Sequence, residues 1–206
     1  MNRGTAKNIV RALASLAVLP LYAACWLLRP LDGNDSFFAA CSQLLSLLPG
    51  KTGSYLRVAF YRRAMERCSA DCFIGFGTVF SQRATVIGDR VYIGPQCNIG
   101  ASRILDDTLI ASGVHVLSGT KQHGIADLSR PIREQTGSFD QITIGRDCWI
   151  GNASVIMASV GDKSIVGAGS VVTQRVQEQA VAAGNPARVI RLRATDSTPP
   201  SQPTAP

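Results

Sequence analysis

The sequence is poor in the side chains that hold metal ions. Histidine occurs only twice in 206 residues, at His115 and His123. No pair of cysteines has the Cys-x-x-Cys spacing that zinc sites commonly use. The cysteines are Cys25, Cys41, Cys68, Cys72, Cys97 and Cys148. These absences argue against a zinc site, and we expect the cysteines to be reduced thiols that pack in the interior.

Charged residues are also scarce, at 17% of the chain, whereas apolar residues make up 46%. This composition excludes intrinsic disorder, and the length suits one domain with an appendage. The net charge is +7, and residues 1–72 hold nine Lys or Arg against four Asp or Glu. These cations lie beside apolar sequence, which favours an anionic membrane surface as a partner. Nucleic acid is disfavoured, because it requires a basic stripe with interleaved aromatics.

A long apolar run is missing as well. The longest stretch without a charge, 12–28, has seventeen residues and contains Pro20, whereas a membrane-spanning helix needs about 20. A second run covers 37–48, after a turn-rich segment at 31–35. We expect a helical hairpin that lies in or dips into one leaflet. Two alternatives remain open: a signal peptide, and an apolar helix pair that packs on its own domain or on a neighbouring subunit.

The segment 53–67 has the pattern of a basic amphipathic helix. Leu56, Phe60 and Ala64 fall on one face, and we expect Arg57 and the other arginines of this segment to lie elsewhere on the helix. Residues 1–72 are therefore predicted to form a helical, membrane-associated extension.

An aliphatic-glycine dipeptide recurs through the rest of the chain, in many places at steps of six residues. It occurs at Ile74-Gly75, Ile87-Gly88, Ile93-Gly94, Ile99-Gly100, Ile144-Gly145, Ile150-Gly151, Val160-Gly161 and Val166-Gly167. Such a hexapeptide repeat predicts a parallel β-helix, in which each repeat forms one short strand and a corner with the aliphatic side chain inside. We expect the glycine to permit a backbone geometry that a Cβ would strain. The predicted fold is mainly β, with the β-helix at 73–193.

Two segments lie outside the repeat. Residues 118–141 interrupt it and carry His123, and a long insertion of this kind is usually functional. Residues 194–206 contain four prolines and are predicted to be a disordered tail.

The repeats resemble those of the left-handed β-helix acyltransferases, which include galactoside, maltose, serine and virginiamycin-type acetyltransferases. The similarity covers about 74–191, and it is most specific in Ile142–Asn152, Val166–Thr173 and Ala182–Arg188. The chain looks most like members associated with exopolysaccharide or lipopolysaccharide assembly. The resemblance implies a left-handed parallel β-helix, a homotrimer with an active site between adjacent subunits, and acetyl-CoA as the acyl donor.

The resemblance also assigns roles to residues. His123 matches the loop histidine that acts as general base on the acceptor hydroxyl, a role suited to an imidazole at neutral pH. The positions that match the coenzyme site are Trp149 and Asn152 at the pantetheine arm, Ala168 and Thr173 as backbone contacts, and Arg188 and Arg191 near the phosphates. Several relatives have Lys after the Thr, whereas this chain has Gln174. Asn98, Asp127 and Glu134 are candidates to orient His123 or to bind the acceptor.

The expected function is therefore an O-acetyltransferase that acts on a saccharide, free or lipid-linked, at the cytoplasmic face of the inner membrane. Alternatives are an N-acyltransferase acting on an amino sugar or antibiotic, an acyltransferase that uses a carrier protein as donor, and a non-catalytic trimeric scaffold. A β-helix of the carbonic anhydrase type is excluded, because its zinc needs three histidines and the chain has two. A sugar nucleotidyltransferase would need a glycine-rich phosphate-binding domain, and none is found.

Overall fold

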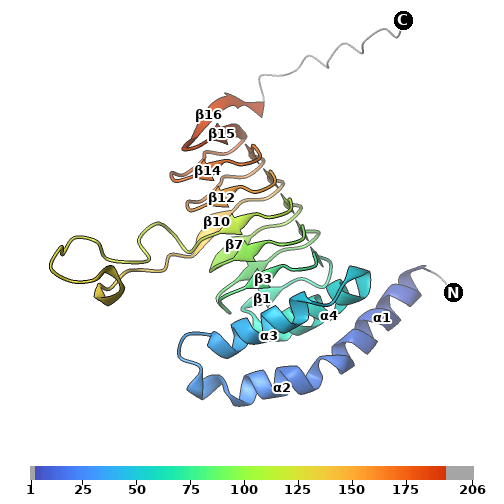
Figure 1. The fold of residues 1–206 in the computed structure, drawn as a ribbon. Helices are drawn as coiled ribbons and strands as arrows, with labels where there is room; N and C mark the ends of the chain where they lie inside the picture. The colour runs from blue at the N-terminus through green and yellow to red at the C-terminus, as the bar shows by residue number, and fades with distance from the viewer. Residues whose placement is uncertain (1–2, 194–206) are drawn as a thin grey trace, which may run out of the picture.

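The computed structural model describes residues 3–193, so the predicted tail at 194–206 lies outside the described residues. Four α-helices come first: α1 (Arg3–Ala17), α2 (Leu19–Leu27), α3 (Ser36–Ser46) and α4 (Gly50–Ala64). Short strands then wind into a β-helix that rises from a helical base, and a long loop projects from its side (Figure 1). The predicted fold class, mainly β with a parallel β-helix and a helical N-terminal extension, is confirmed.

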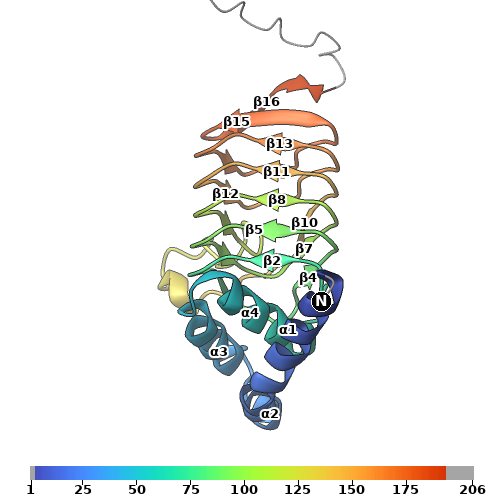
Figure 2. The same cartoon turned by 90° about the vertical axis from the view of Figure 1, so that its right-hand side faces the viewer.

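Three sheets form the walls of the β-helix. The first contains β1 (Arg67–Cys68), β4 (Val86–Ile87), β7 (Ser102–Ile104) and β10 (Ile142–Ile144). The second contains β2 (Phe73–Ile74), β5 (Tyr92–Ile93), β8 (Leu109–Ile110), β11 (Trp149–Ile150), β13 (Ile165–Val166), β15 (Ala180–Gly184) and β16 (Ala187–Leu192). The third contains β3 (Val79–Phe80), β6 (Asn98–Ile99), β9 (His115–Val116), β12 (Val155–Ile156) and β14 (Val171–Val172). Neighbouring strands are parallel, except that β16 runs antiparallel to β15 (Figure 2).

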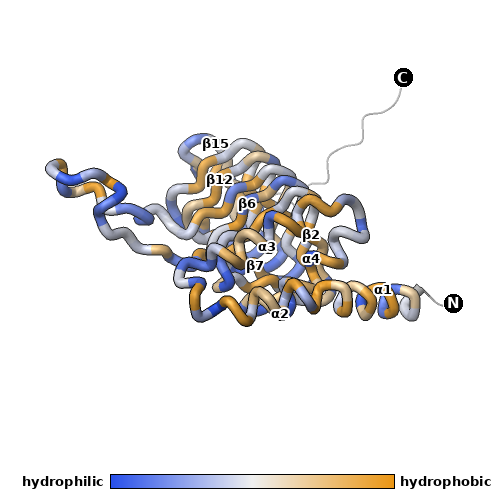
Figure 3. The backbone as a smooth tube through the Cα atoms, turned by 60° about the horizontal axis from the view of Figure 1, so that its bottom comes forward, coloured by the Kyte–Doolittle hydropathy of each residue, from blue (hydrophilic) through white to orange (hydrophobic). Residues whose placement is uncertain are grey.

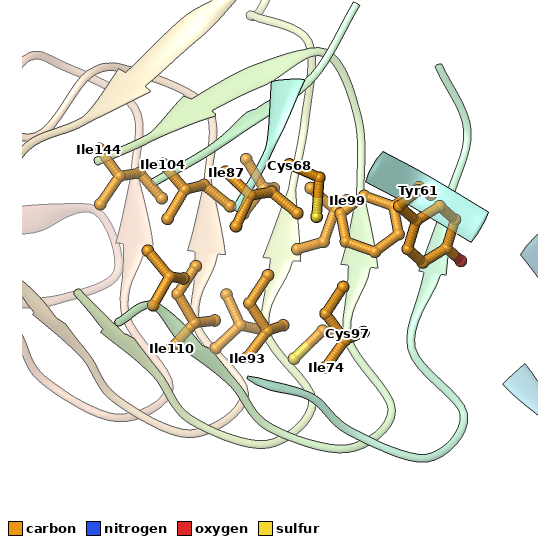
Figure 4. Close-up of a cluster of buried hydrophobic side chains, with 14 of the residues drawn as sticks. Tyr61, Cys68, Ile74, Ile87, Ile93, Cys97, Ile99, Ile104, Ile110 and Ile144 are labelled. Atoms are coloured by element: carbon orange, nitrogen blue, oxygen red, sulfur yellow. The ribbon is translucent and has the colours of Figure 1, made fainter. Parts of the chain in front are cut away.

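The repeated aliphatic side chains fill the interior. Ile74, Ile93 and Ile110 occupy matching positions on successive coils and are fully buried (Figure 4). Corner hydroxyls bond the next coil, as where Thr78 Oγ1 donates to the carbonyl oxygen of Gly94 at 2.7 Å. Each coil thus supplies both apolar contacts and hydrogen bonds to its neighbours, so the stack is stable only as a whole.

The repeated glycines are required by the spacing of the coils. A Cβ placed on Gly75 would lie 2.5 Å from the carbonyl carbon of Gly94, and one on Gly151 would lie 2.4 Å from the nitrogen of Ala168. Neither glycine has the positive φ that would demand it. The expected reason, relief of backbone strain, is therefore wrong at these positions, and close approach of the next coil replaces it.

The β-helix begins before the predicted boundary at residue 73. β1 starts at Arg67 and pairs in parallel with β4, with Cys68 beside Ile87. This coil lacks the aliphatic-glycine signature, because the buried Cys68 stands where later coils have isoleucine and Ser69 where they have glycine. The pattern therefore hid the first strand.

The helices α3 and α4 close the open end of the β-helix. α4 packs on β1 and β2, and α3 packs on β3. Four aromatic rings, Phe38, Phe60, Tyr61 and Phe80, join helix and coil, with Tyr61 and Phe80 centroids 4.7 Å apart. Burial raises the pKa of Tyr61, whose hydroxyl contacts Ser42 Oγ at 2.7 Å. The helical base is therefore an extension of the β-helix core.

Arg57 corrects the expected helix faces. Its side chain is fully buried and donates to the carbonyl oxygens of Leu45 at 3.0 Å, Leu48 at 2.7 Å and Ile74 at 3.0 Å. Burial lowers the pKa of its guanidinium. The predicted helix over 53–67 is observed as α4, and its last predicted residue, Arg67, belongs to β1. Helical periodicity predicts which face of a helix each charged residue occupies. It does not reveal that one of these cations, Arg57, has buried carbonyl groups as partners.

The two apolar runs have different environments. α3, from the second run, buries Phe38, Cys41 and Leu45 against the core, which favours packing on its own domain over a membrane hairpin for this helix. α1 and α2 lie along the outside of the base and show apolar residues to solvent (Figure 3). Within residues 3–193 no single helix is long and apolar enough to cross a membrane, although α1 and α2, bent by 43°, meet that test as a pair.

Candidate functional site

The inserted loop is itself folded. It leaves the third sheet after β9 and rejoins the first sheet at β10, so it emerges at the corner between these sheets (Figure 1). Its two limbs pair through the backbone: Ser138 N donates to Lys121 O at 2.7 Å and Asp140 N to Ser118 O at 3.0 Å. A Cβ on Gly137 would lie 2.2 Å from the carbonyl of Gln122, so only glycine fits where the limbs cross.

His123 lies on the first limb, beside this crossing, and its side chain is exposed. The two acidic candidates of the loop are occupied elsewhere. Asp127 Oδ1 accepts hydrogen bonds from the side chain and backbone of Ser129, at 2.6 and 2.9 Å, which hold its pKa below the usual range. Glu134 lies 3.8 Å from Arg133. Among the described residues neither carboxylate bonds to His123, so Asp127 serves a turn instead of orienting the imidazole.

Asn98 lies on β6 in the third sheet, outside the inserted loop. It is exposed on β6, and its register partner is His115 on β9. The two side chains are therefore neighbours on the outer face of the third sheet, close to where the loop begins. The structure brings Asn98 next to His115 and does not bring it to the acidic loop residues.

Most of the predicted coenzyme residues gather on and beside the second sheet. Trp149 is exposed on β11, and Asn152 follows at the next corner. Ala168 occupies the same corner one coil later, where Gly169 N donates to Asn152 O at 2.8 Å. Arg188 and Arg191 are exposed on β16, which extends the same sheet.

Thr173 is the exception among these candidates. It follows β14 in the third sheet, and it therefore lies at the corner from which the loop emerges on an earlier coil. In one chain the predicted site is divided between two edges: the loop edge, with His123 and Thr173, and the second-sheet edge, with the other five coenzyme candidates.

An apolar column on the outer face of the second sheet, exposed at Tyr92, Leu109 and Trp149, was not predicted. Phe73, Tyr92, Leu109, Trp149 and Ile165 are register partners on successive strands. Phe73 and Tyr92 stack at 5.1 Å, and Tyr92, Leu109 and Trp149 line a hollow of about 340 Å³. The available signal was a large apolar residue immediately before the buried aliphatic of each coil.

Comparison with known proteins agrees with this architecture. A model described as the hexapeptide repeat of succinyl-transferase matches residues 141–174, the segment that contains Trp149, Asn152, Ala168 and Thr173. The chain therefore contains a hexapeptide repeat of this acyltransferase type, and its relatives and structural neighbours are hexapeptide-repeat acetyltransferases. This confirms the resemblance inferred from the repeats.

Two curated relatives and one solved structure show how far this similarity extends. Galactoside O-acetyltransferase of Escherichia coli K12 is 35% identical over 116 residues, which are 55% of this chain and 47% of that protein. A candidate lipopolysaccharide biosynthesis O-acetyl transferase of the same strain is 32% identical over 126 residues, 57% of this chain and 62% of that protein. The chain thus spans about half to two thirds of these curated relatives. A hexapeptide-repeat acetyltransferase of Vibrio cholerae O1 biovar eltor, complexed with acetyl coenzyme A, shares the fold: its TM-score is 0.57 at 22% identity, over 75% of this chain and 84% of that one.

Proposed function

We propose that this protein transfers an acetyl group from acetyl-CoA to a hydroxyl of a saccharide, in the synthesis of a cell-surface polysaccharide. The observation that carries the proposal is the matched repeat at 141–174, which contains four of the six coenzyme candidates. The names of the relatives, a galactoside and a lipopolysaccharide O-acetyltransferase, support a saccharide hydroxyl as acceptor. The complex of the Vibrio cholerae structure supports acetyl-CoA as donor.

The chemistry needs one base and a positioned thioester. The acceptor hydroxyl oxygen attacks the thioester carbonyl carbon while the imidazole of His123 removes the hydroxyl proton. The carbon–sulfur bond then breaks, and the departing thiolate takes the proton from the imidazolium to leave as the CoA thiol. No nucleophilic side chain forms a covalent intermediate. Trp149 and the corner of Asn152 and Ala168 position the pantetheine arm, and the arginines of β16 attract its phosphates.

The proposal includes a homotrimer, because the candidate residues of one chain lie on two edges. The loop edge of one subunit, placed beside the second-sheet edge of the next, completes each site. The loop supports this arrangement, since it exposes Ile125, Leu128, Ile132 and Phe139, with Leu128 97% accessible. Apolar side chains on a folded, projecting loop indicate a surface that packs against another chain.

The proposal also places the protein at the inner membrane, with the β-helix on the cytoplasmic side. The exposed faces of α1 and α2 carry Leu13, Leu16, Trp26 and Leu27, each at least 60% accessible. Cations lie at the ends of this surface, including the exposed Arg29. An apolar helix face with flanking cations suits the interface of an anionic bilayer.

The general-base role is tested by replacing His123 with alanine. We expect loss of acetyl transfer by a factor of about 10² to 10⁴, with acetyl-CoA binding unchanged and activity partly restored by added imidazole. Release of the CoA thiol, followed with a saccharide panel, measures the rate. Lys121→Ala is the matched control, because this exposed residue of the same limb contributes its backbone to the loop. Full activity of His123→Ala would exclude the role.

Calorimetric titration with acetyl-CoA distinguishes the proposed donor from the two alternatives, a carrier-protein donor and a non-catalytic scaffold. Saturable binding supports the proposed donor. Absence of binding by the intact trimer would instead favour a carrier-protein donor or a non-catalytic scaffold.

A further inference from the structure

A second pocket lies where the helical base meets the first coils. Its volume is about 400 Å³, within the range of small-molecule sites. α1 and α4 form one wall, and the corner before β2 and the strand β5 form the other. None of the candidate residues of the acetyl-transfer site lines it.

The pocket is strongly cationic. Lys7, Arg11, Lys51 and Arg90 line it, and Asp71 is the only carboxylate among its lining residues. Asp71 accepts from Lys7 at 2.8 Å and from Arg11 at 3.1 Å. With Asp107, the partner of Arg90, included, four positive charges stand against two negative ones, and this excess suits an anionic ligand.

Two of these cations remain able to bind a ligand. Lys51 is exposed and forms no ion pair with another residue in 3–193. Arg90 forms a bidentate pair with Asp107, but the two side chains are 58% and 47% accessible, so a ligand oxygen can still approach the guanidinium from solvent.

Arg11 supplies an independent sign of an unfilled site. Its Nη2 donates to the carbonyl of Ala70 at 2.6 Å, yet its Nε is buried without a hydrogen-bond partner in the described part of the chain. Buried donors are normally satisfied, so this exception calls for an acceptor. Because this Nε is closed to solvent, a ligand oxygen would reach it only after the Arg11 side chain rotates toward the pocket.

The remaining walls are aromatic. Tyr55 of α4 faces the pocket together with Phe73 and Tyr92, whose rings are stacked nearly parallel, at 5°. Because Phe73 and Tyr92 are stacked on each other, they offer the pocket their edges and remaining faces, beside the ring of Tyr55. An aromatic wall of this kind next to a cluster of cations suits a ligand that combines a ring with a phosphate, because the ring packs on the aromatics and the phosphate oxygens accept from the cations.

The pocket lies on the side of α1 that faces away from its exposed apolar residues. Lys7 and Arg11, which line it, are on the side of the helix opposite Ile9, Leu13 and Leu16, by the 3.6-residue period. If that apolar face rests in a bilayer, the pocket stands about one helix diameter, roughly 10 Å, above it. This is the level of the headgroups, whose region on each side adds several ångströms to a core of about 30 Å.

We propose that this pocket binds the phosphate ester of a phosphorylated saccharide and so selects the acceptor. The identification of this ligand as the acceptor rests on the proposed function, whereas the binding itself does not. The shared chemistry is a sugar-like ring that carries a phosphate, which can be presented either on a lipid or on a soluble molecule.

The experiment titrates the full-length protein, in uncharged detergent, with two probes. Glucose 1-phosphate represents the soluble source, and phosphatidylinositol in the same micelles, against phosphatidylcholine, represents the lipid source. The test variant is the double change Lys51→Gln with Arg90→Gln, because neither residue holds α1 in place. The control is Arg103→Gln, which removes an exposed arginine paired with Glu66 outside the pocket.

Saturable binding of either probe is expected, weakened at least tenfold in the double variant and unchanged in the control. The probe that binds identifies the source. Absence of binding by both probes, or equal weakening in the control, would overturn the proposal. Thermal unfolding of each variant verifies that it is folded. His123→Ala should bind the probe as the wild type does, because His123 is not part of the pocket. A wild-type protein that binds the probe but transfers no acetyl group would disprove the proposed function while leaving the pocket intact.

Discussion

Arg57 connects the helical base to the β-helix through three backbone carbonyl groups. These carbonyls belong to the end of α3, the turn after it and β2. Burial of a carbonyl oxygen without a hydrogen bond is unfavourable, because water cannot replace the missing donor. The Arg57 guanidinium supplies the donors that these three oxygens need.

Replacing Arg57 with leucine should therefore destabilise the protein by about 3 kcal/mol or more, because several buried carbonyls lose a charged donor. Chemical unfolding followed by circular dichroism measures the change in the free energy of unfolding. Arg62→Leu, at an exposed position of the same helix, should alter it by less than about 0.5 kcal/mol. Equal effects of the two substitutions would show that Arg57 stabilises only through helix propensity.

At the scale of single elements, α1 is held to the corner before β2 by ion pairs. Lys7 and Arg11 contact Asp71 in this corner, and Arg63 of α4 also donates to Ser15 at 3.3 Å. The hydrogen bond from Lys7 is the main cause that lowers the pKa of Asp71 below its ordinary value of 3.8, and the charge of Lys7 and the contact with Arg11 add to it. A carboxylate whose pKa is lower in the folded state contributes stability above the unfolded pKa and loses it as the pH falls through the folded pKa.

Asp71→Asn should accordingly loosen α1 at neutral pH, by about 1 kcal/mol or less because the pairs are exposed. Faster amide exchange confined to 3–17 is the expected signature. The difference from wild type should shrink as the pH falls through the lowered folded-state pKa of Asp71, and it should vanish once the carboxyl is protonated in both the folded and the unfolded state. Asp107→Asn, which removes an exposed partner of Arg90, serves as the control. A difference that persists at low pH would show that the anchor is not electrostatic.

The exposed face of α1 gives a separate prediction at the same scale. Leu13→Glu combined with Leu16→Glu should release the protein from anionic vesicles in a flotation assay, because burying carboxylates at the interface is unfavourable. The matched control is Leu44→Glu with Leu47→Glu, since these leucines are equally exposed at the end of α3. Vesicle binding that survives the first pair and is lost with the second would place the membrane contact on α3.

The elements differ in how well the sequence predicted them. The coils from β2 to β15 follow from the six-residue period, because an aliphatic such as Ile93 or Ile150 has no other place than the interior. The six-residue period did not predict three other features: the register of the apolar column, the burial of Arg57 and the position of α3. Each depends on contacts between segments far apart in sequence, as where Phe80 N meets Ser42 Oγ at 2.8 Å. His123 was found as a loop residue, whereas the local partners of Asp127 were not visible in the pattern.

For the whole molecule, a site divided between two edges predicts complementation between subunits. His123→Ala and Asn152→Trp, each inactive as a pure trimer, should regain part of the activity when they are coexpressed, because some interfaces then join an intact loop edge to an intact second-sheet edge. Acetyl transfer by the mixed, purified trimers measures the gain. Two different substitutions within the loop edge provide the control and should give no gain. Activity absent from every mixture would place the complete site within one chain.

The two ends of the β-helix are closed in different ways. At the base, α3 and α4 cover the first coil, while at the far end β16 turns back antiparallel on β15. The backbone of an uncovered last coil would be a template for another molecule, and such edges promote fibre formation unless they are blocked. β16 presents Arg188 and Arg191 to solvent, with Arg193 just beyond it. The arginines that we propose for coenzyme phosphates thus have a second consequence: they oppose end-to-end aggregation, because two such positively charged edges repel each other.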